Sequence, residues 1–370
     1  MDSEEKIIIP KNKMLLAVGI IVILIIISVF FIIQSLPKET KDDNSDDGVV
    51  SDDRLPFVKI LLIENNCPEC TPIEPLIETI KLFDVNVLEV KTIDADSPEG
   101  QDIIKMHGIT KLPSLIVNGE FQGTELQNVW SEIGEEKNGV LVLTKAIPPY
   151  YSLEEQRLVG EVKFLLIKNS SCIDCMDLSS IASDLREINV FIEEERTIEF
   201  DSEEAQFLLE NYLIDRVPVI LLGGDVNEYD YLTEIWPAVG SVEYDGVFVY
   251  REAVPYFDLF SEEVNGLVEV TKLVDETCLD CVDVNYLLEP LNYIGIKASK
   301  ETTIDISSAE GKALIEKYSI TKIPTIIVSS EAEEYTDFFV IWPDVGTQEE
   351  DGTFVFRNLE ATEQPFVTLE

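Results

Sequence analysis

The residues of this chain best suited to chemistry are six cysteines, arranged as three Cys-x-x-Cys motifs. They are Cys67 and Cys70, Cys172 and Cys175, and Cys278 and Cys281. Two thiols at this spacing can form a short disulfide, exchange it with another thiol, or supply two of the four sulfur ligands of a zinc ion. The chain has a single histidine, His107, which excludes histidine-rich metal sites and repeated Cys–His nucleophile pairs.

The three motifs belong to three copies of one repeat. The first cysteines of the motifs are 105 and 106 residues apart, and each is followed 46 residues later by a proline. Each copy also contains a tryptophan with a glycine four residues after it. These recurring residues are Pro113, Pro218 and Pro324; Trp130, Trp236 and Trp342; and Gly134, Gly240 and Gly346. A period above 100 residues is that of a whole domain and not of a solenoid repeat.

The elements that must position these residues recur in the same order. Each copy opens with an apolar strand, expected at 58–65, 162–169 and 268–275. The Cys-x-x-Cys motif follows, and then an amphipathic helix such as 71–82. After a second strand, Ser97, Ser202 and Ser308 fit the N-cap of a second helix that runs into the proline and a buried strand. Asn-Gly or Asp-Gly turns precede a last strand, so the pattern indicates an α/β layer structure.

A strand leading into Cys-x-x-Cys at a helix start, with a proline before another strand, resembles the thioredoxin-like fold. The resemblance covers about 70 of about 105 residues in each copy. It implies that the first cysteine of each motif is the nucleophile and that the second resolves the mixed disulfide. It also implies that the three prolines are cis, lie beside the disulfides, and face the substrate. A cysteine at a helix N-terminus would have its thiolate stabilised there.

The copies lack two features that are frequent in that family, the tryptophan before the first cysteine and the buried acid six residues upstream. Their places are taken by Asn66, Ser171 and Thr277, and by Leu61, Leu166 and Lys272. Glu69, Asp174 and Asp280 lie inside the motifs, where a carboxylate disfavours the thiolate. We therefore expect reducing or weakly isomerising pairs, or stable disulfides, and not strongly oxidising ones.

Lys272 is the charged residue among those upstream positions. An ammonium facing Cys278 would favour its thiolate, which predicts that Cys278 is the most acidic of the three nucleophiles. A one-residue change of strand register would instead point Lys272 at solvent.

Charge and hydropathy divide the chain into two parts. Its 370 residues carry a net charge of −45, and residues 1–40 sum to zero, so the excess lies in 41–370. Such a surface repels phosphates, and we expect no nucleic-acid partner. Residues 14–33 carry no charge and would span roughly 30 Å as a helix, without a cleavage site after them. We expect an uncleaved membrane anchor with a cytoplasmic N-terminus and the remainder outside the cell, because three lysines precede it.

The expected organisation has six parts. They are an N-terminal cytoplasmic stub (1–13), a transmembrane anchor (14–33), an acidic linker (34–54), and thioredoxin-like domains at 55–150, 151–260 and 261–370.

Three functions are compatible with this organisation. The first is a membrane-anchored thiol–disulfide oxidoreductase, reductase- or isomerase-like, that acts on exported proteins with an unknown redox partner. The second is a tandem scaffold or binding module with structural disulfides, and the third is a four-cysteine zinc site between domains. We expect disulfides within each domain, since the domains lie outside the cytoplasm, and no cofactor or metal beyond these redox-active disulfides.

Overall fold

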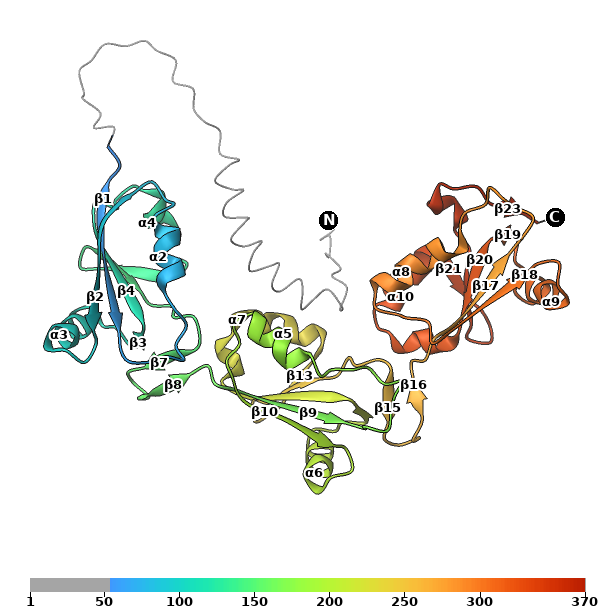
Figure 1. Cartoon of the computed structure of the whole chain (residues 1–370), viewed down its shortest axis with the longest axis horizontal. Coiled ribbons are helices and arrows are strands. Elements are labelled where there is room, and N and C mark those ends of the chain that lie inside the picture. The colour runs from blue at the N-terminus through green and yellow to red at the C-terminus, as the bar shows by residue number, and fades with distance from the viewer. Residues whose placement is uncertain (1–53, 370) are drawn as a thin grey trace, which may run out of the picture.

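A computed structural model describes residues 54–369 and folds them into three α/β domains that follow one another along the chain (Figure 1). The expected stub, the anchor at 14–33 and all but the last residue of the acidic linker lie outside the described residues. Within 54–369, no helix is both long and apolar enough to cross a membrane.

Each domain contains one five-stranded sheet, and the strand order is the same three times: β2-β1-β4-β6-β5, β10-β9-β12-β14-β13 and β18-β17-β20-β22-β21. The first two strands of each domain pair in parallel and the others antiparallel. The first domain comprises β1 (Phe57–Glu64), α2 (Glu74–Ile80), β2 (Asn86–Asp94), α3 (Pro98–His107), β3 (Lys111–Leu112), β4 (Ser114–Gly119), α4 (Glu125–Trp130), β5 (Gly134–Lys137), β6 (Val140–Leu143), β7 (Tyr150–Ser152) and β8 (Arg157–Val159).

The other two domains have the same order of sheet strands and α-helices, and they add short 3-10 helices, labelled η. The second comprises β9 (Val162–Lys168), α5 (Ile181–Glu187), β10 (Ile192–Glu199), α6 (Glu203–Asn211), β11 (Arg216–Val217), β12 (Val219–Gly224), η2 (Val226–Glu228), α7 (Asp230–Ile235), η3 (Trp236–Ala238), β13 (Gly240–Val242), β14 (Phe248–Tyr250), β15 (Tyr256–Asp258) and β16 (Val264–Asn265). The third comprises β17 (Glu269–Val274), η4 (Val284–Leu288), α8 (Glu289–Tyr293), β18 (Lys300–Asp305), α9 (Ala309–Tyr318), β19 (Lys322–Ile323), β20 (Thr325–Val328), η5 (Ser330–Glu334), α10 (Phe338–Val345), β21 (Gly346–Gln348), β22 (Phe354–Phe356), η6 (Leu359–Thr362) and β23 (Val367–Thr368).

Each sheet has a hydrophobic layer on both faces. In the first domain, Val58 and Ile60 of β1 pack with α2, α4 and Trp130 on one face. Ile63 packs with α3 on the other face, beside Leu112. A strand buried on both sides explains why the opening segments are almost continuously apolar. The α/β layer structure predicted from the sequence is thus present in each copy, and it is thioredoxin-like.

The predicted helix caps and turns are confirmed. The hydroxyl oxygens of Ser97, Ser202 and Ser308 accept hydrogen bonds from backbone N–H groups three residues on, at 3.0, 3.2 and 2.8 Å. These bonds satisfy donors that the first helical turn leaves unpaired. At the Asn138-Gly139 turn both residues have positive φ, 54° and 78°, as a tight hairpin between β5 and β6 requires.

The tryptophan–glycine pair holds the outer hairpin against the core. Trp130 is buried, and its indole N–H donates to the carbonyl of Val142 at 3.3 Å. A Cβ on Gly134 would lie 2.4 Å from Trp130 Nε1 and 2.3 Å from Val142 O, so no larger residue fits there. Gly240 and Gly346 meet their own tryptophan and strand in the same way. The tryptophan and the glycine therefore serve to pack the outer hairpin against the core.

The predicted helix start at the Cys-x-x-Cys motif is wrong in all three domains. Helix α2 begins at Glu74, four residues after Cys70, and α5 begins at Ile181, six residues after Cys175. In the third domain a 3-10 helix begins at Val284 and the α-helix only at Glu289. In each domain, the backbone N–H of the residue after the second cysteine, which would form the first hydrogen bond of such a helix, donates to a segment near the end of the domain instead.

Candidate disulfide exchange site

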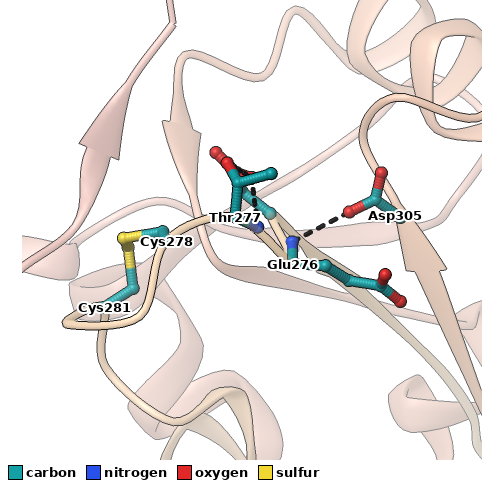
Figure 2. The surroundings of a disulfide bond; sticks show 6 residues. Glu276, Thr277, Cys278, Cys281 and Asp305 are labelled. Atoms are coloured by element: carbon teal, nitrogen blue, oxygen red, sulfur yellow. Dashed lines mark hydrogen bonds between the residues drawn. A yellow bond between two sulfur atoms is a disulfide. The ribbon is translucent and has the colours of Figure 1, made fainter.

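The six cysteines form one disulfide within each domain: Cys67–Cys70, Cys172–Cys175 and Cys278–Cys281. The intradomain pairing expected for domains outside the cytoplasm is therefore confirmed. Each disulfide lies on a surface turn, as Figure 2 shows for the third. The first cysteine of each pair is partly exposed, while Cys70 is only 8% exposed. With all six sulfurs paired, no thiolate in residues 54–369 is left to form the zinc site considered above.

The three predicted prolines directly follow the short strands β3, β11 and β19. The peptide bonds Leu112–Pro113, Val217–Pro218 and Ile323–Pro324 are cis. Pro113 is partly buried, and Pro218 and Pro324 are buried. The prolines therefore offer little free surface to a substrate in this structure.

A segment near the end of each domain contacts both the residue after the second cysteine and the short strand before the proline. We call these segments straps: residues 148–152, 254–258 and 364–368. Each strap accepts a hydrogen bond from the residue directly after the second cysteine. The donors and acceptors are Thr71 N to Pro149 O at 2.7 Å, Met176 N to Pro255 O at 2.7 Å and Val282 N to Pro365 O at 2.8 Å. In a helix starting at the motif these N–H groups would bond the carbonyl of the first cysteine, so the strap replaces the first helical turn.

The strap then pairs with the strand that precedes the cis-proline. Antiparallel pairing joins β3 to β7, β11 to β15 and β19 to β23. The residue just before each proline is opposite a strap residue: Leu112 opposite Tyr151, Val217 opposite Phe257 and Ile323 opposite Val367. The resemblance implied that the prolines face the substrate. In the structure, the domain's own chain pairs with the strand before each proline.

The loop before the first cysteine is anchored by an acid at the end of the second strand. The backbone N–H of Glu276 donates to Asp305 at 2.9 Å (Figure 2), and Ser170 donates its N–H to Glu199 at 2.9 Å. The bond from the Glu276 backbone, joined by those from Ser307, lowers the pKa of Asp305 below its usual range. These acids belong to the Thr-Ile-acid segments, and they fix where the disulfide turn leaves the sheet.

Lys272 does not point at solvent, and it does not stand free beneath Cys278. It is 8% exposed, and its ammonium forms an ion pair with Glu301 and donates to Asn285 Oδ1 at 2.6 Å. Strand pairing aligns Lys272 with Leu166 and with Leu62, not with Leu61. The register change therefore lies in the first domain. Since Glu301 compensates the ammonium, the expected acidity of Cys278 from a free cation is not supported.

This arrangement favours slow thiol–disulfide exchange. The first cysteine of each pair is partly exposed, and exchange requires a thiolate to reach one sulfur of the disulfide. Neither a helix N-terminus nor an uncompensated cation stabilises the thiolate that leaves, and the exposed acids Glu69, Asp174 and Asp280 disfavour it. That the pairs are not strong oxidants stays a prediction.

Sequence reasoning missed the straps, although a signal for them was present. Every domain ends in a proline followed by an aromatic residue: Pro149-Tyr150, Pro255-Tyr256 and Pro365-Phe366. The segments 146–157 and 254–265 are rich in proline, aromatic residues and acids, a composition that predicts joints between domains. Their contact with the disulfide turn depends on tertiary pairing, which no local pattern encodes.

Comparison with known proteins agrees with the fold only in outline. No family model matches the chain, and no curated protein matches it. Among solved structures, it is similar to the NTD_N/C domain of alkylhydroperoxide reductase AhpF from Enterococcus faecalis (21% identity, 45% of this chain and 81% of that one, TM-score 0.16). It is also similar to ERdj5 (13%, 76% and 39%, 0.15) and to zinc-bound human ERp44 (13%, 77% and 83%, 0.14). With TM-scores this low, the fold assignment depends on the strand order, disulfide and cis-proline of each domain. These features define a thiol–disulfide oxidoreductase-like protein with three thioredoxin-like domains.

Proposed function

We propose that this protein is a membrane-anchored, extracytoplasmic thiol–disulfide oxidoreductase of the reductase or isomerase kind, acting on exported proteins. The observation that carries the proposal is that all three domains retain a surface Cys-x-x-Cys disulfide together with a cis-proline linked to it through one strap. A domain kept only as a spacer needs neither feature. The cysteines at 67, 172 and 278 would attack, and those at 70, 175 and 281 would resolve.

Apolar residues beside the sulfurs favour a polypeptide substrate. Ile173 and Leu279, each directly after the first cysteine, are 90% and 92% exposed. A large side chain so exposed next to a disulfide can contact apolar groups of an unfolded chain. In the first domain Pro68 takes this place.

The remaining parts of the proposal come from the sequence. Residues 14–33 would anchor the protein in the cell membrane, with the three domains outside. The partners would be thiols and disulfides of exported proteins and a redox partner of unknown identity, without a cofactor other than the disulfides.

A disulfide-braced scaffold is the second candidate, and one observation favours it. Because the strap takes the amide donor after the second cysteine, no helix N-terminus activates the pair. If this candidate holds, the disulfides remain oxidised and exchange with no polypeptide.

Trapping of mixed disulfides separates the two candidates. The full chain with Cys70, Cys175 and Cys281 changed to Ser keeps three nucleophiles and no resolving thiol. We expect it to accumulate disulfide-linked adducts with exported proteins, detected as reducible bands. A variant with all six cysteines changed to Ser is the control. Adducts no more abundant than in this control would exclude the enzymatic function.

A further inference from the structure

A cavity of about 960 Å³ lies at the joint between the second and third domains. This volume is in the range of small-molecule sites, roughly 300–1,000 Å³. Helices α5 and α7, which lie on the same face of the second sheet (Figure 1), form its inner walls together with β12 and β14. Residues 294–299 and Tyr335 of the third domain line it from the other side. The cavity is therefore bounded by two domains, and its shape depends on the joint between them.

The inner wall of the cavity is apolar. Burial raises the pKa of the Tyr250 phenol to about 12, so this group is neutral in the wall. The remaining side chains of the wall are aliphatic or aromatic, and most are buried in the core of the second domain. The wall is formed by Ile181, Leu185, Leu222, Leu232, Trp236 and Tyr250. It offers an apolar ligand a surface without a charged group.

The rim of the cavity is acidic. Hydrogen bonds from the hydroxyl and the backbone of Ser179 lower the pKa of Asp177 below its usual range, so its carboxylate is ionised at neutral pH. Among the lining residues in the described part of the chain, Lys297 is the one cation. An opening of one charge sign with apolar walls concentrates the electric field, and here that field attracts cations. The rim carboxylates are Asp174, Asp177, Asp184, Glu187 and Glu252.

The framework of the domains does not require the rim carboxylates on α5. The first domain has Thr79 and Leu82 at the positions 105 residues before Asp184 and Glu187. The helix α2 that carries Thr79 packs against its own sheet as α5 does. The two carboxylates of α5 are therefore a property of the second domain and not of the repeat.

The cavity also touches the contacts that hold the joint. Thr336 donates its hydroxyl hydrogen to Glu252 at 3.1 Å, and Tyr335 donates to Gly266 O at 3.0 Å. The Gly266 N–H donates to Glu331 at 2.6 Å. The joint between the first two domains has a matching bond, from Gly160 N–H to Asp225 at 2.9 Å. Because Glu252 and Tyr335 line the cavity, a bound molecule would stabilise the second joint.

We propose that this cavity binds a small amphiphilic cation, with an apolar chain or ring system against the inner wall and one ammonium group at the rim beside Asp184 and Glu187. A neutral apolar molecule would fill the wall without using the rim, and the rim repels an anion of the same shape. The inference goes beyond the proposed exchange function, since binding changes no covalent bond and needs no cysteine.

Three water-soluble probes separate the two parts of the site. Phenylbutylammonium has an apolar body and a cation, phenylbutanoate has a closely similar body and an anion, and methylammonium has the cation alone. Calorimetric titration of the full-length, oxidised chain measures their affinities. We expect phenylbutylammonium to bind at least tenfold more tightly than either of the others. Equal affinity for phenylbutanoate or for methylammonium would overturn the proposal.

Paired variants of the full-length chain place the binding in the cavity. Asp184→Thr with Glu187→Leu gives α5 the residues of α2, and we expect the affinity for phenylbutylammonium to fall about fivefold. Glu203→Thr with Glu210→Leu removes the same two charges from exposed positions of α6 and is the matched control. Equal losses in the two proteins would assign the binding to the overall negative charge and would overturn the proposal.

A second pair of variants fills the cavity instead of discharging it. Ala298→Trp places an indole among the lining residues, and we expect it to weaken binding at least tenfold. Ala361→Trp, at an exposed position of the same domain, is the control. Unchanged affinity in Ala298→Trp would overturn the proposal.

Amide hydrogen exchange gives a readout inside the molecule. With saturating phenylbutylammonium, we expect the Gly266 amide at the second joint to exchange at least threefold more slowly. The Gly160 amide, which makes the matching bond at the first joint, should be unaffected. Equal slowing at both joints, or at neither, would overturn the proposal.

Discussion

The first and third domains share one framework and differ in how their disulfide sites are covered. Both have the same strand order, a buried tryptophan against a glycine, and a capped second helix. Their straps differ, because Tyr150 bonds the next domain and Phe366 cannot. The two domains thus have equivalent cores, and they differ in the polar contacts made by the segment at the domain end.

The largest predicted effect tests the shared part of the comparison. Trp130→Ala and Trp342→Ala each remove a buried indole from the core, and we expect each to destabilise its own domain by about 3–5 kcal/mol. Denaturant unfolding, monitored by amide hydrogen exchange in each domain, measures the loss of stability. Phe260→Ala, at a side chain 97% exposed, is the control. A loss in only one of the two domains would show that the frameworks are not equivalent.

The first and third domains also differ in one buried charge, the ammonium of Lys272 in the third domain. Glu301→Gln leaves the Lys272 ammonium buried with one neutral partner, and we expect a loss of about 2–3 kcal/mol in the third domain. Lys272→Leu restores the residue type of the first domain and leaves Glu301 half-exposed to water, so its cost should be under about 1 kcal/mol. Chemical denaturation of both variants measures the difference. If Lys272→Leu cost more stability than Glu301→Gln, Glu301 would not compensate the charge of Lys272 as the structure indicates.

Removing one hydroxyl from the first domain and adding it to the third should reduce the difference in how firmly their straps are held. Thr71→Val removes the bond to Pro148 O and should loosen the first strap by about 1 kcal/mol. Val282→Thr offers the third strap the same donor and should tighten it by a smaller amount. Exchange rates of the strap amides provide the measurement, and identical rates before and after both changes would contradict this role of Thr71.

The smallest predicted effect is a pH dependence in the stability of the joint between the first two domains. Burial alone would raise the pKa of Asp225, but the bonds from Arg157 and from the Gly160 N–H leave it below its usual value. A lowered folded pKa means that the joint gains stability above about pH 4 and loses it as the pH falls through the folded pKa. Because Arg157 is exposed, the loss should stay below about 1 kcal/mol.

Exchange of the Gly160 amide between pH 7 and pH 3, corrected for the intrinsic rate, tests this linkage. Asp225→Asn is the control, since it should remove the pH dependence. An acid-induced loosening that survives in Asp225→Asn would assign the effect to another group.

The sequence was sufficient to predict the disulfides, the prolines and the second helices of the three domains. It was not sufficient to predict which segment contacts the disulfide turn. Repetition located the disulfides and prolines, and cap residues such as Ser97 located the second helices, because these signals are local or recur three times. The helix start at Cys67 was predicted wrongly because the partner of the Thr71 amide lies 78 residues away, at Pro149. The environment of Lys272 was also beyond reach, since Glu301 meets it only through strand pairing.

Mixed-disulfide trapping, domain by domain, tests the central claim most directly. Three full-length proteins carry Cys70→Ser, Cys175→Ser or Cys281→Ser alone, so that one nucleophile is free in each and the other two disulfides stay intact. With a mixture of exported proteins as substrate, we predict that each of the three proteins forms disulfide-linked adducts through its free nucleophile, above the level of a protein with all six cysteines changed to Ser. Trapping no greater than in the protein without cysteines would contradict the account.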